Sequence, residues 1–261
     1  MPNGKINGKR NIGANAYRLI LLAIMIVVWQ IISMFLGRMF LPAPSGVATA
    51  AVELFTNGVI IEATFNSFTI FAGGYLLAVS LAVPLGLIMG GFKRIGEALD
   101  VYINAFNAMP RIALIPLIII WFGLGFEAKV VVVLLSAFFP IVINTYTGVM
   151  NVDKDLLEAS RSFGAKDKDI FLRVMLPASL PFIITGLRLG TARGIMGIIM
   201  AEFFTSVSGL GGLIITYGNT FQMERLFVAV TVLTVMGGIL SELLKRMERF
   251  IAPWKIMELH A

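Results

Sequence analysis

The stretch NVDKDLLEASRSFGAKDKDIFLRVMLPASLP, residues 151–181, is a charged island between two long apolar segments. Upstream, Lys129 to Met150 carries no charge after its first residue, and downstream Leu180 to Phe204 carries only two arginines and one glutamate. About 20 apolar helical residues cross the hydrocarbon core of a bilayer, which is about 30 Å thick. Each segment is therefore long enough to cross a membrane, and the island lies on one side of it.

The composition of the whole chain supports this interpretation. Apolar residues make up 58% of the 261 positions, charged residues make up 14%, and the mean hydropathy is +0.89. That leaves too little polar surface for a water-soluble globule, so we expect an integral membrane protein. Cysteine is absent and the single His260 is next to last, which excludes disulfides, thiolate chemistry and histidine metal sites. We predict no catalytic residue and no metal site.

Six stretches are candidates for membrane-spanning helices. The third is polar and interrupted by Pro110, and the fourth contains Pro140. The six run from Leu19 to Leu36, within Glu62 to Lys93, from about Leu99 to Phe122, from Lys129 to Met150, from Leu180 to Phe204 and from Leu226 to about Lys245. We therefore expect an all-α, six-helix transmembrane domain over residues 19–247, with an N-terminal segment (1–18) and a C-terminal tail (248–261).

The basic N-terminal segment followed by an apolar stretch resembles the start of a signal peptide. The apolar stretch is longer than the usual 7–15 residues of such a peptide, however, and no A-x-A-like cleavage site closes it. We therefore expect an uncleaved first helix.

Lysine and arginine are unevenly distributed when successive connections are assigned to alternate sides of the membrane. Fifteen fall on the inner side and three on the outer side. Cytoplasmic loops accumulate these residues, so both termini and the loop 151–179 are expected in the cytoplasm, and the net charge of +6 requires no nucleic-acid partner. The inner set is Lys5, Lys9, Arg10, Arg18, Lys93, Arg94, Lys154, Arg161, Lys166, Lys168, Arg173, Lys245, Arg246, Arg249 and Lys255; the outer set is Arg38, Lys129 and Arg225.

The charged island itself predicts two short helices. Asp153 or Asp155 can cap the first, and Gly164 supplies the positive φ that commonly stops a helix. Asp167 can cap the second, which Pro177 is expected to end. The product is a pair of short amphipathic helices that meet at an angle and offer apolar and charged side chains to a cytoplasmic partner. The alternative is an ordinary connector that lies on the membrane surface.

The spacing in this island resembles a family signature. Glu158-Ala159-Ser160, then Gly164, then Val174-Met175-Leu176-Pro177 resemble the signature Glu-Ala-Ala, three residues, Gly, nine residues, Ile-x-Leu-Pro. That signature belongs to the inner-membrane permeases of binding-protein-dependent ABC importers. Ser160 replaces the second alanine and Val174 replaces the isoleucine, and both changes are mild. Met109 to Gly125, Gly186 to Gly190 and Ala201 to Ile214 also resemble the nitrate, sulfonate and taurine branch.

The resemblance implies a fold, a location and a set of partners. It implies the type I ABC importer permease fold in a bacterial inner membrane, and a dimer, with homodimerisation favoured, whose fifth span lies near the interface. Two cytoplasmic ATPase subunits and an external solute-binding protein would serve the dimer. The coupling contact with the ATPase would fall on Glu158, Ala159, Ser160, Gly164, Leu176 and Pro177.

The energy source is expected to lie outside this chain. No G-x-x-x-x-G-K-[ST] motif occurs in the sequence, so ATP and Mg would be bound by the partner subunits and this chain would bind no cofactor. An ion-coupled secondary transporter is the more distant alternative, but it would need Asp, Glu or His in mid-membrane. Glu202 lies only towards the outer end of span five, and a membrane enzyme would need acid–base groups that are absent.

Arginines within the spans are the candidate solute contacts. An arginine at the centre of a bilayer costs roughly 2.5 kcal/mol or more, so Arg111, Arg188 and Arg193 are each expected to face a cavity, another polar group or the cytoplasmic interface. Together with Glu202 they are the candidate residues of a solute pathway. These arginines favour a small anion such as a sulfonate, taurine or nitrate. One alternative left open is structural: the guanidinium groups bond helix-end carbonyls near Pro110 or Pro181, or snorkel inward to the membrane interface. Another is that the solute is a small heterocycle such as a thiamine or riboflavin precursor.

Glycines form two further patterns. Gly86 and Gly90, and the triple Gly186, Gly190 and Gly194, repeat at a spacing of four and predict close approach of helix backbones. The segment SVSGLGG, residues 206–212, is expected to form a tight re-entrant turn that closes the outer mouth or meets the binding protein, with Gly209, Gly211 and Gly212 as a candidate outer gate.

Overall fold

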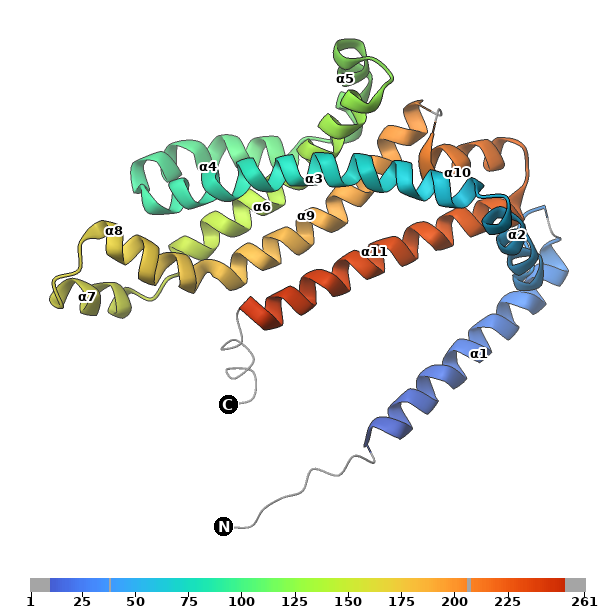
Figure 1. The fold of residues 1–261 in the computed structure, drawn as a ribbon, viewed down its shortest axis with the longest axis horizontal. Helices are drawn as coiled ribbons and strands as arrows, with labels where there is room; N and C mark the ends of the chain where they lie inside the picture. The colour runs from blue at the N-terminus through green and yellow to red at the C-terminus, as the bar shows by residue number, and fades with distance from the viewer. Residues whose placement is uncertain (1–9, 38, 206–207, 252–261) are drawn as a thin grey trace.

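The computed structural model describes residues 10–37, 39–205 and 208–251, and these are helical with short connections (Figure 1). The elements are α1 (Arg10–Leu36), α2 (Pro44–Thr56), α3 (Val59–Gly91), α4 (Lys93–Ala108), η1 (Arg111–Leu114), α5 (Ile115–Phe122), α6 (Phe126–Met150), α7 (Lys154–Ser162), α8 (Asp167–Ile170), η2 (Phe171–Met175), α9 (Leu176–Thr205), α10 (Gly209–Asn219) and α11 (Met223–Ile251). The predicted all-α class is confirmed.

The number of spans agrees with the sequence analysis. Within the described part of the chain, five helices are long and apolar enough to cross a membrane. They cover 16–36, 59–91, 126–150, 167–205 and 223–247. The pair α4 and η1–α5 makes a sixth span if this bent pair is counted as one.

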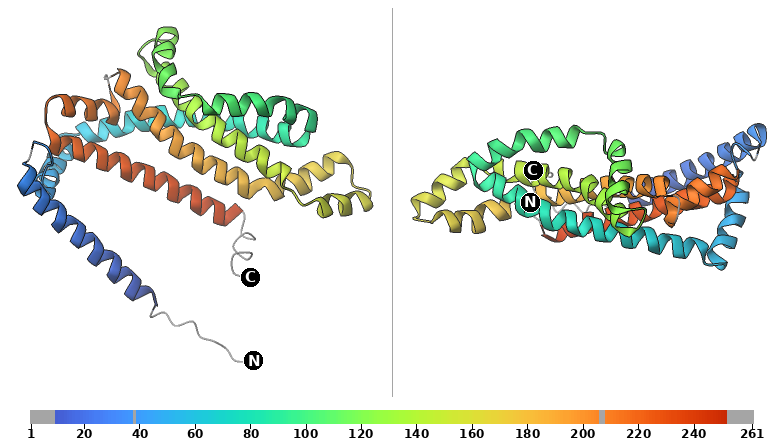
Figure 2. Two further views of the ribbon diagram at one scale, coloured as in Figure 1. Left: turned by 180° about the vertical axis from the view of Figure 1, so that it is seen from behind. Right: turned by 90° about the horizontal axis from the view of Figure 1, so that it is seen from above.

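The third span is broken at Pro110, as the sequence predicted. Met109 is extended, with φ −65° and ψ 132°, because a residue that precedes proline is pushed out of the helical region. The helices on either side of the break meet at 84°, and α5 projects away from α4 (Figures 1 and 2). The span begins at Lys93 rather than near Leu99.

The expected end of the second cytoplasmic helix at Pro177 is wrong. α8, η2 and α9 form one helical run over residues 167–205, and Lys166, not Asp167, is the N-cap residue. In a regular α-helix the ring of Pro177 would clash with the carbonyl of Arg173. The π-helical turn η2, Phe171–Met175, widens the helix just before this proline, so the chain passes it without a break.

Small residues let α6 pack tightly between α3 and α9, which confirms the predicted close approach. A Cβ added at Gly90 would meet Val149, and one at Gly86 would lie 2.6 Å from the Cβ of Thr145. A Cβ added at Gly186 would lie 2.8 Å from the Cβ of Asn144. Around these contacts lies a buried core from α3 and α6: Ala78, Ala82, Met89, Ala137, Ile141 and Val142.

The N-terminal helix α1 leans away from the other long helices (Figures 1 and 2). It is held near its end, where the indole Nε1 of Trp29 donates to the carbonyl of Pro42 at 3.0 Å and the Ser33 hydroxyl donates to the carbonyl of Leu41 at 2.8 Å. The ring of Trp29 also lies 5.7 Å from that of Phe227 on α11.

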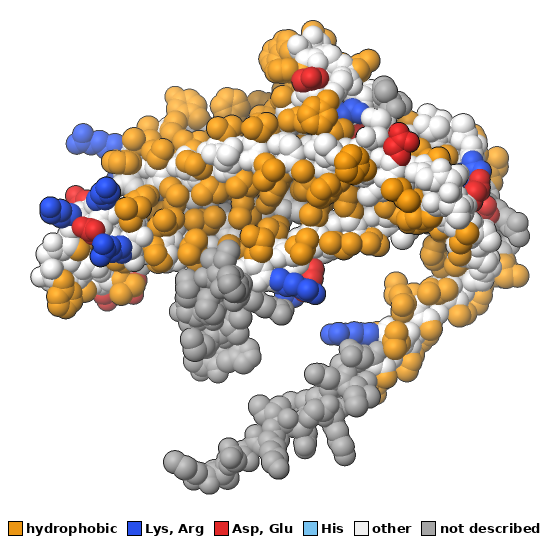
Figure 3. Space-filling view, viewed as in Figure 1, with side chains coloured by type: hydrophobic (Ala, Val, Ile, Leu, Met, Phe, Trp, Pro, Cys, Tyr) orange, Lys and Arg blue, Asp and Glu red, His pale blue; other side chains and the backbone are white. Residues whose placement is uncertain are grey.

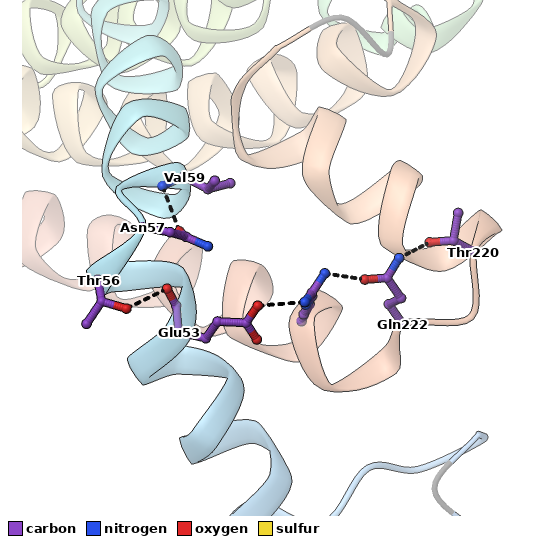
Figure 4. A network of polar contacts seen from close by, with 7 residues as sticks. Glu53, Thr56, Asn57, Val59, Thr220 and Gln222 are labelled. Carbon is purple, nitrogen blue, oxygen red and sulfur yellow. Dashed lines mark hydrogen bonds and ion pairs between the residues drawn. The ribbon is translucent and has the colours of Figure 1, made fainter.

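Short α2 is tied to the beginning of α11 by a polar network (Figure 4). Arg225 pairs with Glu53 at 2.7 Å and donates to Gln222 at 2.7 Å, and the Gln222 amide donates to the Thr220 hydroxyl at 3.0 Å. The network fixes the short helix at the end of the bundle opposite α7 (Figure 1).

The tight contact between α9 and α6 can be tested at Gly190. A Cβ there would lie 2.7 Å from Cγ1 of Ile141 and 3.2 Å from the carbonyl oxygen of Ala137. Gly190→Ala should therefore lower the thermal stability of the purified protein in detergent, by about 1–3 kcal/mol. At Gly238 on α11 an added Cβ meets nothing within 4 Å, so Gly238→Ala should be neutral or slightly stabilising. Equal melting temperatures for the two variants would contradict this packing.

Candidate functional site

The first element of the site is α7 at one end of the bundle (Figure 1). Its N-cap is Asp153, whose carboxylate accepts a hydrogen bond from the backbone N–H of Asp155 at 2.8 Å. Its stop is Gly164, with φ +80°. The N–H of Gly164 donates to the carbonyl of Arg161 at 2.9 Å, and that of Ala165 donates to the carbonyl of Ser160 at 3.1 Å. This is a Schellman motif, and it confirms the predicted glycine stop.

The α7 surface that the sequence singled out is accessible. Glu158 and Ala159 are exposed, and Ser160 is half-buried with its hydroxyl donating to the carbonyl of Leu156 at 2.7 Å. Leu176 and Pro177 are half-buried at the start of α9, further along the chain from this surface. Figure 3 shows Lys and Arg side chains gathered at this end of the molecule.

Sequence reasoning overlooked the most exposed apolar residue of this surface. Phe163 is 91% exposed at the C-cap of α7. Leu156, about two helical turns earlier, is 53% exposed. Free apolar side chains of this size on a polar helix are typical of a docking surface. The available signal was an aromatic residue placed directly before the helix-stopping Gly164.

The second element is a cavity at the break of the third span, which we call the arginine cavity. Its volume is about 340 Å³, and Arg111 and Arg193 both line it. The remaining lining residues are Asn107, Ala108, Met109, Pro110, Ile112, Ser136, Met196, Gly197 and Met200. The structure thus brings together two predicted arginines that are far apart in the sequence.

The two other predicted pathway residues lie elsewhere on α9. Arg188 is half-buried and is not among the residues that line the arginine cavity. Glu202 is 1% exposed and lies further along α9 than Arg193. Of the four candidates, only Arg111 and Arg193 therefore share a cavity.

The third element is a buried hydrogen-bonded cluster around Glu202. Its carboxylate accepts from the Ser67 hydroxyl and from the backbone N–H of Gly211, both at 2.7 Å. The Ser67 oxygen in turn accepts from the N–H of Leu210 at 2.8 Å. These bonds join α3, α9 and the N-terminus of α10, where a carboxylate is favoured by the helix dipole.

A buried lysine completes the surroundings of this cluster. Lys129 is 3% exposed, and its ammonium group donates to the Ser208 hydroxyl at 3.0 Å, just before α10 begins. α6 therefore also reaches the segment that precedes α10.

The segment that was expected to form a re-entrant turn contains the beginning of a helix, and the turn and the outer gate stay predictions. Gly209, Gly211 and Gly212 are buried and open the helix α10, while residues 206–207 lie outside the described part of the chain. The physical reason is that Glu202 and Ser67 satisfy the first N–H groups of a helix, which a sequence pattern of glycines does not reveal.

The cluster around Glu202 gives a stability prediction. Gly209 has φ +85°, and an added Cβ would collide with the Glu202 carboxylate. Gly58 has a similar φ of +77° but open space around it. Gly58→Ala should therefore cost only the left-handed backbone penalty, about 1–2 kcal/mol, whereas Gly209→Ala should cost more because the carboxylate must move. Thermal unfolding in detergent measures both, and an equal loss would show that the cluster does not confine this position.

Comparison with known proteins agrees with these features. Residues 82–255 match the family described as binding-protein-dependent transport system inner membrane component. An ABC transporter permease protein of Brucella abortus (strain 2308) is 33% identical, over 84% of this chain and 88% of the relative. The aliphatic sulfonates transport permease protein SsuC of Bacillus subtilis (strain 168) is 31% identical, over 91% and 87%.

A solved structure shows the same fold. An inward-facing structure of the MetNI methionine ABC transporter has a chain that matches with a TM-score of 0.65 at 18% identity, covering 76% of this chain and 98% of that one. The long apolar helices of the structure agree with what the family match and the solved structure indicate, which is a membrane component of a transporter. The chain is a multi-pass inner-membrane protein and belongs to the permease components of binding-protein-dependent ABC importers.

Proposed function

We propose that two copies of this chain form the translocation pathway of an importer for a small organic or inorganic anion, such as a sulfonate. Two cytoplasmic ATPase subunits bind ATP and Mg and drive the cycle, and an external solute-binding protein delivers the solute. The chain itself performs no covalent chemistry. Both of its termini and α7 face the cytoplasm.

The exposed surface of α7 is the observation that carries this proposal. The Schellman motif at Gly164 ends the helix so that Phe163 is presented at its tip, with the Glu158 carboxylate exposed on the same short helix. A hydrophobic anchor beside a charged group suits a groove in another protein subunit better than a lipid surface. That favours ATPase docking over a connector lying on the membrane.

One face of α9 supports the proposed dimer. Leu189, Arg193, Met196 and Met200 are exposed and recur every three or four residues, so they share one face of the helix. A second copy facing this stripe would cover it and would place both arginine cavities beside a shared pathway. The same stripe would otherwise expose a cationic side chain to lipid, which is unfavourable.

The arginine cavity is the reason for preferring an anion. None of the described residues that line it is acidic, so no carboxylate in its lining balances the positive charges of Arg111 and Arg193. The relative SsuC carries sulfonate transport in its name. A heterocyclic solute and an ion-coupled cycle remain the competing interpretations. The latter is disfavoured because Glu202, a carboxylate within a span, is buried and already bonded to Ser67 and Gly211.

The coupling role of α7 can be tested at Gly164, where an added Cβ would meet nothing within 4 Å. A substitution there acts through backbone conformation alone. Gly164→Asn should retain most transport, because asparagine tolerates the left-handed region, whereas the β-branched Gly164→Val should abolish it. Solute uptake by reconstituted complexes in proteoliposomes, driven by ATP, measures both variants.

A charge reversal on the same surface separates docking from folding. Glu158→Lys should insert into the membrane normally but lose the ATPase on co-purification. Full transport and normal co-purification of both Glu158→Lys and Gly164→Val would contradict the coupling assignment.

The proposed orientation follows from the fifteen-to-three distribution of basic residues. Reporter fusions after Asp167 should be active in the cytoplasm, and fusions after Thr56 should be active outside. An external Asp167 would place α7 out of reach of any cytoplasmic ATPase and would overturn the proposed function.

A further inference from the structure

Two hollows meet at the Arg111 side chain. On one side lies the arginine cavity, of about 340 Å³, which Arg193 also lines. On the other side lies a hollow of about 260 Å³, which we call the apolar groove; it is lined by Phe106, Met109, Arg111, Leu114, Leu117, Ile118, Trp121, Leu135 and Phe139. Arg111 and Met109 line both, so the two hollows adjoin at these residues. A charged region therefore adjoins an apolar one.

The Arg111 guanidinium is held in place and is incompletely satisfied. Its Nη2 donates to the side-chain oxygen of Asn107 at 2.8 Å and to that residue's carbonyl at 3.3 Å. Its carbon Cζ lies 5.6 Å from the centre of the Phe139 ring. Its Nε is buried without a hydrogen-bond partner among the described residues. An unbonded buried donor of a charged group is costly, and an anion beside the guanidinium would offset part of the cost of burying its charge.

The chemistry of the lining residues selects the ligand. Guanidinium groups bind planar or tetrahedral oxyanions through several N–H groups, so an acceptor at Arg111 and Arg193 is best supplied by an anionic headgroup. The Ser136 hydroxyl is engaged as a donor to the carbonyl of Val132 at 2.7 Å and has no proton left for the ligand. No described lining residue is acidic, so a ligand's ammonium group would find no countercharge in either hollow.

We propose that the arginine cavity and the apolar groove together form one binding site for an oxyanion with an apolar tail, of the alkanesulfonate class. The headgroup lies between Arg111 and Arg193, and the tail lies along Phe139, Leu135 and Trp121. The solute binds transiently at this site during its passage through the permease. The inference rests on the proposed function, and it adds a preference for simple alkyl chains over chains that end in an amine.

Trp121 provides a reporter that does not depend on transport, because it lines the groove in which the tail is placed. The other two tryptophans, Trp29 and Trp254, can be replaced by Phe so that Trp121 is the only tryptophan of the permease, and the same titration with Trp121→Phe gives the background emission of the ATPase. The complex of permease and ATPase is placed in nanodiscs of zwitterionic phosphatidylcholine and titrated with hexane-1-sulfonate. We expect a saturable change of Trp121 emission. Hexyltrimethylammonium carries a tail of equal length on a cation and should give none.

Arginine variants test the headgroup contact. Arg193→Gln and Arg111→Gln should each weaken hexane-1-sulfonate binding at least tenfold, and Arg111→Lys should weaken it less because the charge remains. Arg246→Gln is the matched control, since Arg246 is an exposed α11 residue paired with Glu242 at 3.4 Å. Unchanged affinity in Arg193→Gln and Arg111→Gln, measured on complexes that still co-purify with the ATPase, would overturn the site.

A tail series and a lipid series complete the test. Affinity should rise from methanesulfonate to hexanesulfonate, and taurine should bind more weakly than ethanesulfonate. If the emission change instead follows the fraction of phosphatidylglycerol in the nanodisc and soluble sulfonates do not compete, the headgroup belongs to a lipid and the inference is wrong.

Transport assays distinguish the failure of this inference from the failure of the proposed function. Proteoliposomes that import sulfonates while Trp121 emission and the arginine variants show no binding would leave the proposed function standing and remove this site. Complexes that import no anion under any condition would remove the proposed function, whereas saturable arginine-dependent binding would still support the site.

Discussion

Close backbone contact of α6 with α3 and α9 is the constraint on which the rest of the structure depends. Inside a membrane, lipid solvates apolar side chains as well as another helix does, so helices gain stability chiefly where small residues allow many close contacts. Gly86 and Gly90 of α3 and Gly190 of α9 provide such contacts on two sides of α6. The fixed position of α6 then places Ser136 and Phe139 beside the broken third span and Lys129 beside the start of α10.

The break at Pro110 depends on the packing of α6 against α3 and α9. Non-helical backbone at membrane depth is tolerated where it is covered by protein or lines a cavity. Here α6 and α9 provide both conditions, because their side chains form the far wall of the arginine cavity. The same break that interrupts the regular helix at Met109 and Pro110 also places Arg111 at the wall of the cavity. The break in the third span and the charged side chains of Arg111 and Arg193 thus share one hollow.

The features that the sequence predicted correctly are those that depend on residues close together in the sequence. The break at Pro110, the stop at Gly164 and the close approach of Gly86 and Gly90 follow from local backbone rules, and each is present in the structure. The continuity past Pro177 depends on a π-helical turn that no residue type specifies. The α10 helix was missed because its N–H partners, Ser67 and Glu202, come from other helices. The meeting of Arg111 and Arg193 likewise depends on tertiary packing.

The uninterrupted helical run through η2 connects the three elements of the site. It covers residues 167–205, so it begins beside the exposed helix α7, carries Arg193 along its length and reaches Glu202 near its far end. A packed helix moves largely as a rigid body, because shortening or stretching it would break its hydrogen bonds. If α7 docks on the ATPase as proposed, a displacement passed from α7 to this run would reach the arginine cavity and the α10 cluster together. Had Pro177 ended the helix, as local reasoning suggested, a non-helical connection would have separated α7 from both.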